Sequence, residues 1–163
     1  MDEDDFSNMI KKIQNKINKI QGEIYSEKVI YEYNNPINFG TIKNPDSKAE
    51  IKGSCGDTMK IELKIENDTI KEARFWTDGC GATIACGNML TKMIKGKSLS
   101  ELRDIDHYDL LESLEGLPPE HTHCSVLAIN TLNKAIQNYK KKIDCTKKFN
   151  LIFYNNHKIS IIY

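Results

Sequence analysis

The sequence has little arginine, no net charge and no long apolar segment. Its 23 basic residues, nearly all of them lysine, balance 23 acidic ones over 163 residues. Because nucleic-acid binding rests on an excess of basic surface, we expect no nucleic-acid partner. No apolar stretch is long enough to span a bilayer, so we expect no membrane segment. The first residues, MDEDDF, are acidic, unlike secretory or transit peptides, which predicts a cytoplasmic protein.

Closely spaced cysteine pairs are also missing. The chain has five cysteines, and no two of them lie two to four residues apart. An odd number of cysteines in a chain without an export signal argues against a disulfide framework. Structural zinc sites normally use such close pairs, so a compact zinc finger is not expected. Metal or redox chemistry that uses distant thiols is favoured instead.

Three β-strands are predicted between residues 48 and 77. The clearest one alternates apolar with charged residues, as a strand with one buried face does, and its apolar positions are Met59, Ile61, Leu63 and Ile65. Asn67-Asp68 then predicts a turn, and residues 70–77 return as a second strand. Residues 48–52 complete the set. Three short antiparallel strands in succession predict a meander.

Helices are predicted on both sides of these strands. Residues 25–30 begin or continue a helix, and the apolar spacing after Gly81 suits another that ends near Gly96. Ser98 to Glu101 matches a capping box that opens a short helix. Residues 107–114 suit a further helix. The strongest helical pattern extends from about Ser125 to Lys141.

Residues 1–24 form a predicted N-terminal helical extension with an apolar seam. The spacing of the seam alternates between four and three residues, which is the a/d pattern of a coiled coil, at Phe6, Ile10, Ile13, Ile17, Ile20 and Ile24. Two interpretations stay open at this point. The seam packs on its own domain, or it contacts a partner or a second copy of the chain.

Residues 143–163 form a C-terminal extension with two β-prone runs. These runs are residues 151–154 and 159–162, and four polar residues separate them. Adjacent asparagines in that separator tolerate positive φ, so the segment predicts a β-hairpin. A disordered tail is the equal alternative.

Three of the cysteines lie where predicted elements end. Cys55 precedes the alternating strand, Cys80 lies between two glycines before a helix, and Cys124 begins the longest helix. A helix N-terminus stabilises a thiolate through unpaired amides and the helix dipole. Thiolates from three distant segments suit iron–sulfur ligation at a site that can open. Zinc suits the same site, because it shares soft ligands and tetrahedral geometry.

Neighbouring residues offer further ligands. Asp57, two residues after Cys55, is interpreted either as a labile fourth ligand or as a turn residue. His121 or His123 would supply a nitrogen beside the thiols.

The last two cysteines are harder to place. Cys86 lies six residues after Cys80, so the two side chains need not face the same way on a helix. It packs in the core, or it lies near the cluster as an additional sulfur ligand. Cys145 lies in a lysine-rich stretch and is expected to be incidental.

These segments resemble the NifU N-terminal and IscU family of iron–sulfur scaffold proteins. The resemblance extends from about Tyr25 to Lys140 and rests on several motifs in order: YSEKVIYEYNNPINFG, GSCGDTMKIELKI, ARFWTDGCGATIA, MIKGKSL, LEGLPP and HCSVLA. It implies an α+β fold of the IscU/SufE-like type, in which a three-stranded antiparallel sheet packs against helices. This scaffold domain would span residues 25–142, between the two extensions.

The resemblance also implies a site and an activity. The ligand cysteines of the family fall on Cys55, Cys80 and Cys124, its aspartate tied to cluster release falls on Asp57, and its adjacent histidine falls on His123. Such a protein is a scaffold rather than an enzyme. It receives persulfide sulfur from a cysteine desulfurase, takes up iron and builds a 2Fe–2S cluster, with coupling to 4Fe–4S. The cluster then passes to acceptor apoproteins. The seam of residues 6–24 leaves a homodimer open.

A partner-binding stretch departs from the bacterial pattern of the family. The bacterial stretch for an Hsp70-type chaperone is LPPVK, whereas this chain has Leu117, Pro118 and Pro119 followed by Glu120-His121. Two other functions stay open beside the scaffold. One is a zinc-bound sulfurtransferase partner of a desulfurase, as in the related SufU group. The other is a structural zinc or interaction module that acts through residues 6–24.

Overall fold

The alternating segments form an antiparallel meander in the computed structural model, which describes residues 3–157. The strands lie in the order β1-β2-β3 and comprise β1 (Ser47–Lys52), β2 (Thr58–Glu66) and β3 (Thr69–Thr77). Asn67 and Asp68 between β2 and β3 both have positive φ, at 50° and 57°, which a tight two-residue hairpin turn requires. The predicted meander and its turn are confirmed.

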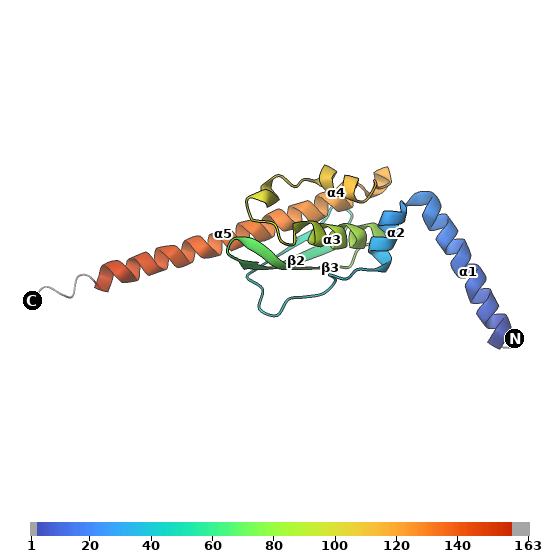
Figure 1. The fold of residues 1–163 in the computed structure, drawn as a ribbon, viewed down its shortest axis with the longest axis horizontal. Coiled ribbons are helices and arrows are strands. Elements are labelled where there is room, and N and C mark those ends of the chain that lie inside the picture. The colour runs from blue at the N-terminus through green and yellow to red at the C-terminus, as the bar shows by residue number, and fades with distance from the viewer. Residues whose placement is uncertain (1–2, 158–163) are drawn as a thin grey trace, which may run out of the picture.

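One face of the sheet carries the hydrophobic core. Met59, Ile61 and Leu63 of β2 are each 0% exposed, and they alternate with residues that face away from the core. Two helices, α3 (Gly81–Ile94) and α5 (His123–His157), pack on the sheet, as Figure 1 shows. Burying one side chain of this size contributes roughly 1.5–3 kcal/mol. The core therefore fixes both helices against the sheet, which gives the predicted α+β fold.

Shorter helices connect these elements: α2 (Glu27–Asn34), η1 (Glu101–Arg103), α4 (His107–Ser113) and η2 (Pro119–His121). The predicted capping box is present, because Ser98 N donates to Glu101 Oε2 at 2.7 Å and Glu101 N donates to Ser98 Oγ at 3.3 Å. The helix that it opens, η1, is a single 3-10 turn. Asp106 caps α4 with the same reciprocal bonds.

A buried carboxylate holds α2 against α3. Glu32 is 1% exposed, and its Oε2 accepts hydrogen bonds from Asn88 Nδ2 and Lys92 Nζ, both at 2.6 Å. A buried charge is tolerated when it is paired and hydrogen-bonded in this way. The contact fixes α2 near the start of α3, where the ring of Tyr33 lies against Gly81.

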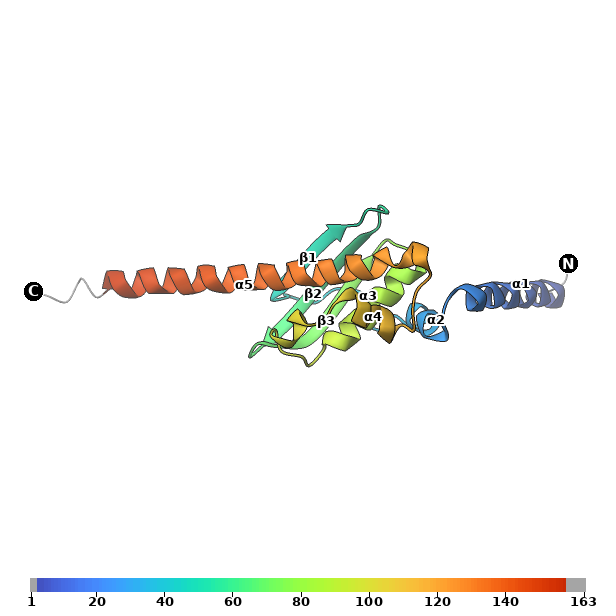
Figure 2. The ribbon, with the colours of Figure 1, turned by 90° about the horizontal axis from the view of Figure 1, so that it is seen from above.

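The last helix is longer than predicted. α5 begins at His123 and ends at His157, where the sequence pattern indicated residues 125–141. Residues 151–154 lie in this helix, so the predicted hairpin is wrong there, and its second half, residues 159–162, falls outside the described residues. Adding residues to an existing helix needs no new nucleation, which favours a helix over a hairpin for residues 151–154. Figure 2 shows α5 extending well beyond the sheet.

The N-terminal helix α1 (Glu3–Ile24) points away from the rest of the molecule, as Figures 1 and 2 show. The predicted helix is confirmed, but its seam does not pack on its own domain. Phe6, Ile13 and Ile20 are 50%, 46% and 55% exposed. Of the two interpretations of the seam, the intradomain one is therefore wrong. No helix within residues 3–157 combines the length and apolar character needed to cross a membrane.

We expect the substitution Gly87→Ala to lower the free energy of unfolding by about 1–3 kcal/mol, because a methyl group has no space there. A Cβ at Gly87 in α3 would overlap the ring of Phe75 in β3, with Cγ only 2.8 Å away. Chemical denaturation measures the effect. Gly22→Ala in α1 is the control, since a Cβ there meets nothing within 4 Å. A Gly87→Ala protein as stable as the parent would contradict this packing.

Candidate metal centre

Two helices begin at the same end of the sheet, and each begins at a cysteine. Cys80 directly precedes α3, and Cys124 is the second residue of α5. The side chain of Cys80 makes no capping hydrogen bond to its helix. The unpaired amides and the dipoles of both helices favour negatively charged sulfur at this end.

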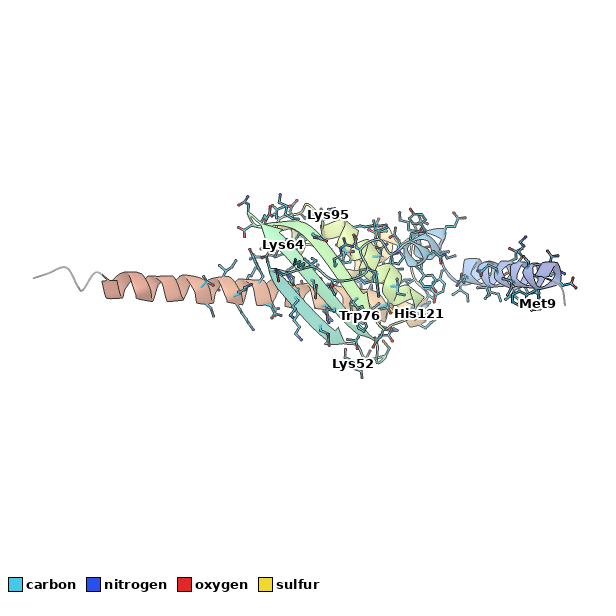
Figure 3. The ribbon with its side chains drawn as sticks, turned by 90° about the horizontal axis from the view of Figure 1, so that it is seen from below. Met9, Lys52, Lys64, Trp76, Lys95 and His121 are labelled. Carbon is cyan, nitrogen blue, oxygen red and sulfur yellow. The ribbon has the colours of Figure 1, made fainter. Side chains whose placement is uncertain are left out.

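His121 forms a compact group with these two cysteines. The two Sγ atoms and a ring nitrogen of His121 all lie within 4.8 Å of one another. His121 Nδ1 is 3.9 Å from Cys80 Sγ. Thiolate and imidazole are the ligands that zinc and iron take in proteins, so this donor set suits a soft metal site. Figure 3 shows His121 near the end of the sheet where Trp76 lies, and away from Lys64 and Lys95 at the other end.

Thr83 links both thiols to Asp57. Its Oγ1 lies 2.9 Å from Asp57 Oδ2, 3.3 Å from Cys124 Sγ and 3.6 Å from Cys80 Sγ. A hydroxyl carries one proton, so Thr83 can donate to the carboxylate or to the sulfur of Cys124, but not to both at once. Sequence reasoning missed this buried residue. The available signal was its i+3 spacing from Cys80, which places both on one face of α3.

Asp57 reaches this group from the loop between β1 and β2. Besides its bond with Thr83, its Oδ2 accepts a hydrogen bond from Cys80 N at 3.4 Å. Gly79 makes room for it, because a Cβ there would overlap the carboxylate and lie 2.9 Å from Thr83 Cβ. The structure thus places Asp57 beside the thiols, in contact with the backbone of one of them.

The thiols differ in exposure, and burial shifts the pKa of Cys124. Cys80 is exposed, whereas Cys124 is 0% exposed. Burial raises the pKa of Cys124 from 9.0 to about 12; the hydrogen bond from Thr83 opposes the shift, and the charges of Cys80 and Cys55 add to it. Cys55 is therefore within electrostatic reach, although it is exposed and lies outside the compact group. Cys124 must lose a proton before it binds a metal ion, so binding releases a proton there.

Two further side chains border the group. His123 Nε2 is 3.6 Å from Cys124 Sγ, so the structure brings both candidate histidines beside the thiols. The ring of Tyr25, between α1 and α2, lies 5.6 Å from the ring of His121. Burial raises the pKa of Tyr25, and the neighbouring charges of Cys80 and Cys124 raise it further.

The remaining predicted residues lie outside the group. Cys86 is 0% exposed within the core, and burial raises its pKa well above 9.0. Cys145 is exposed on α5. The predicted partner-binding residues extend into η2, which begins at Pro119 and ends at His121; Leu117 and Pro118 are half-buried and Pro119 is exposed.

The fold and this donor set define a small α+β protein with a thiol and imidazole site at paired helix N-termini. The chain belongs to the family of the NifU-like N terminal domain, whose model matches residues 24–146.

Similar proteins agree with this assignment. The chain is 41% identical over 137 residues to the iron-sulfur cluster assembly protein IscU of Plasmodium falciparum (isolate 3D7), a match that covers 80% of this chain and 84% of that protein. It is 45% identical over 123 residues to the iron-sulfur cluster assembly scaffold protein IscU of Escherichia coli (strain K12), covering 72% and 95%. The corresponding IscU of Aquifex aeolicus (strain VF5) is 40% identical over 121 residues, covering 72% and 77%.

Solved structures show the same fold. The N-terminal NifU-like protein from Brucella abortus matches with a TM-score of 0.61 at 19% identity, covering 76% of this chain and 98% of that chain. A scaffold protein for the SUF system from Fervidobacterium islandicum AW-1, itself described as putative, matches with a TM-score of 0.59 at 23% identity, covering 70% and 97%. At these identities the likeness concerns the fold alone.

The exposure of the cysteines predicts their order of alkylation. With iodoacetamide at mildly alkaline pH, Cys55, Cys80 and Cys145 should react first, because they are exposed. Cys124 should react far more slowly, since it is buried and a pKa of about 12 leaves little thiolate. Mass spectrometry of the digested protein over time measures each site, and the urea-unfolded chain supplies the reference rates. Equal rates for Cys80 and Cys124 in the folded protein would contradict the described burial.

Proposed function

We propose that this chain is a scaffold on which an iron–sulfur cluster is assembled and from which it is handed on. One observation carries the proposal: two thiols and an imidazole converge within 4.8 Å, with Asp57 in contact with Cys80 N and Cys55 within electrostatic reach of Cys124. The family assignment supports it, because relatives at 40–45% identity are named as IscU assembly proteins. The cluster is cargo here, and the chain supplies its ligands.

In this proposal three cysteines anchor the iron. Cys80 and Cys124 are held at the starts of α3 and α5, and Cys55 lies exposed on the loop between β1 and β2. A 2Fe–2S cluster takes four protein ligands, and three thiolates leave one position to fill. Coupling to a 4Fe–4S cluster is a further step that the same thiols would support.

The fourth position can be filled from either side of the group. His121 lies on the Cys80 side at 3.9 Å, and His123 lies on the Cys124 side at 3.6 Å. The family resemblance points to His123. His121 stands where the bacterial stretch LPPVK has lysine, so this chain offers a metal-binding imidazole at a position that otherwise carries a cation.

Sulfur would arrive from a cysteine desulfurase as a persulfide. Cys80 or Cys124 accepts it in this proposal: its thiolate attacks the outer sulfur and releases the thiol of the desulfurase. Cys80 is exposed and reachable, whereas Cys124 lies behind Thr83 and has to be uncovered first. Iron, sulfur and electrons all come from partners, so we propose a scaffold without catalytic turnover of its own.

The flanking features fit this role. We propose that residues 25–142 form the scaffold unit and that the two extensions serve other contacts. Only Glu120 separates Leu117, Pro118 and Pro119 from His121, so an Hsp70-type chaperone that bound there would lie next to the metal site. Acceptor apoproteins complete the proposed set of partners.

A zinc-bound sulfurtransferase partner of a desulfurase, as in the SufU group, is the second candidate. The compact Cys-His-Cys group favours it, because zinc takes such ligands in tetrahedral geometry. Metal analysis of protein purified without oxygen separates the two functions. Bound iron with acid-labile sulfide supports the scaffold, and zinc retained with a persulfide-carrying thiol supports the sulfurtransferase.

Cysteine substitutions test the scaffold directly. Anaerobic reconstitution with ferrous iron, cysteine and a cysteine desulfurase should give the visible absorption of a 2Fe–2S cluster. Cys80→Ser and Cys124→Ser should abolish it, because each removes a thiolate from the compact group. Cys145→Ser is the matched control and should retain full absorption. Cluster formation in both site variants would contradict the proposed ligands.

The role of Asp57 predicts slower cluster loss in Asp57→Ala. The carboxylate contacts Cys80 N and Thr83, so its removal takes a weak oxygen ligand away from beside the thiols. Loss of absorption in the presence of a chelator should slow severalfold. The control is Asp78→Ala, which removes a nearby carboxylate that bonds the backbone of Thr58. Faster loss in Asp57→Ala than in the parent would refute this role.

A further inference from the structure

The apolar seam of α1 is free of the rest of the molecule. Its six residues, Phe6, Ile10, Ile13, Ile17, Ile20 and Ile24, are between 43% and 55% exposed. They form one continuous stripe, because alternating steps of three and four residues stay on one helix face. Figure 3 shows Met9, next to this stripe, on a helix that lies apart from the sheet. So much aligned apolar surface marks an interaction site.

The width and charge of the helix favour a protein partner over a lipid surface. The seam residues occupy the a and d positions of a heptad repeat, and Met9 adds one apolar residue at a g position. Such a narrow apolar stripe is typical of a coiled coil. Helices that lie on membranes carry a broad apolar face and gain from basic residues on the polar face. α1 has four lysines and four acidic residues, so its own charge gives no net attraction to anionic lipid.

The seam fits another copy of itself. A helix with a strict a/d repeat packs its side chains into a partner with the same repeat. Over the described part of the other long helix, α5, apolar residues such as Leu132 and Ala135 are buried in the core and offer no free seam. Among helix residues up to Thr146 whose side chains the structure describes, α1 is the long helix with an exposed apolar face.

The flanking positions favour a parallel arrangement. In a parallel coiled coil, each g residue faces the e residue five positions later in the partner helix, which places Lys16 opposite Gln21 and Met9 opposite Gln14. No like charges meet. In the antiparallel alignment of the same seam, Lys16 faces Lys16 of the other copy. Isoleucine at both core positions further favours three or more strands over two.

We propose that α1 is a self-association helix, which joins copies of this chain through its seam in a parallel coiled coil, with a trimer as the expected state. The scaffold domains then all lie at the C-terminal end of the coil. α1 leads directly to Tyr25, whose ring contacts His121, so the metal sites of the copies lie at the same end of the assembly. This proposal goes beyond the scaffold function and does not depend on it.

Sedimentation equilibrium of the full-length protein, over a wide concentration range, tests the proposal. The parent chain should sediment as a trimer. Ile13→Lys with Ile17→Lys, at a d and an a position, should convert it to a monomer. Asn8→Lys with Asn15→Lys, both at outward f positions, adds the same charge to the opposite face and should leave the oligomer intact. Zinc binding should be unchanged in all three proteins, since the seam does not contact the core.

The outcomes are decisive. A parent chain that is monomeric at every concentration, or seam variants that associate like the parent, would overturn the proposal. A monomer that binds anionic vesicles through the seam would also overturn it. If the parent chain is a dimer and the seam substitutions convert it to a monomer, self-association through the seam is supported. The expected number of helices in the coil then changes from three to two.

The alignment has its own test. In the parallel arrangement Gln21→Glu places a carboxylate opposite Lys16 of the next copy, so association should tighten at low salt, and the gain should fade as salt is added. In the antiparallel arrangement residue 21 faces Ser7, and the substitution should change nothing. An unchanged association constant for Gln21→Glu would overturn the parallel alignment.

Discussion

The packing of α3 and α5 against one face of the sheet is the constraint on which the site depends. Both helices bury their apolar faces on β2 and its neighbours, and both begin at the same end of the sheet. Cys80 and Cys124 are far apart in the sequence. They lie close together there because packing in the core fixes where both helices start. Hydrophobic packing thus sets the geometry of the metal site, and Cys124 is itself part of the core.

The metal site places two opposing requirements on its cysteines. A cysteine binds metal as a thiolate, yet burial raises the pKa of Cys124 to about 12. Thr83 supplies one hydroxyl proton to be shared between the sulfur of Cys124 and the carboxylate of Asp57. Cys55 and Cys80 are exposed at the rim. A site built this way can bind a metal, but two of its cysteines stay exposed to solvent and Thr83 cannot donate to both of its acceptors at once. Such incomplete enclosure suits a site that releases its cluster.

Local patterns in the sequence were sufficient for most of the fold. Alternation gave β2, the Asn67-Asp68 pair gave the hairpin turn, and glycines around Cys80 marked a helix start. Features set by tertiary contacts could not be predicted from local patterns. Whether His121 joins the thiols depends on the path of η2. Thr83 contacts the site only because the carboxylate of Asp57 lies over Gly79. The length of α5 was missed because β-prone residues extend an existing helix at little cost. Periodicity revealed the α1 seam but not that it is exposed.

X-ray absorption at the zinc edge, on protein loaded with one equivalent of zinc, tests most directly whether the distant thiols and an imidazole share one metal. The account predicts sulfur neighbours at about 2.3 Å together with nitrogen or oxygen neighbours at about 2.0–2.1 Å. The sulfur contribution should fall in Cys80→Ser and in Cys124→Ser. A coordination shell of nitrogen and oxygen alone, unchanged by either substitution, would contradict it.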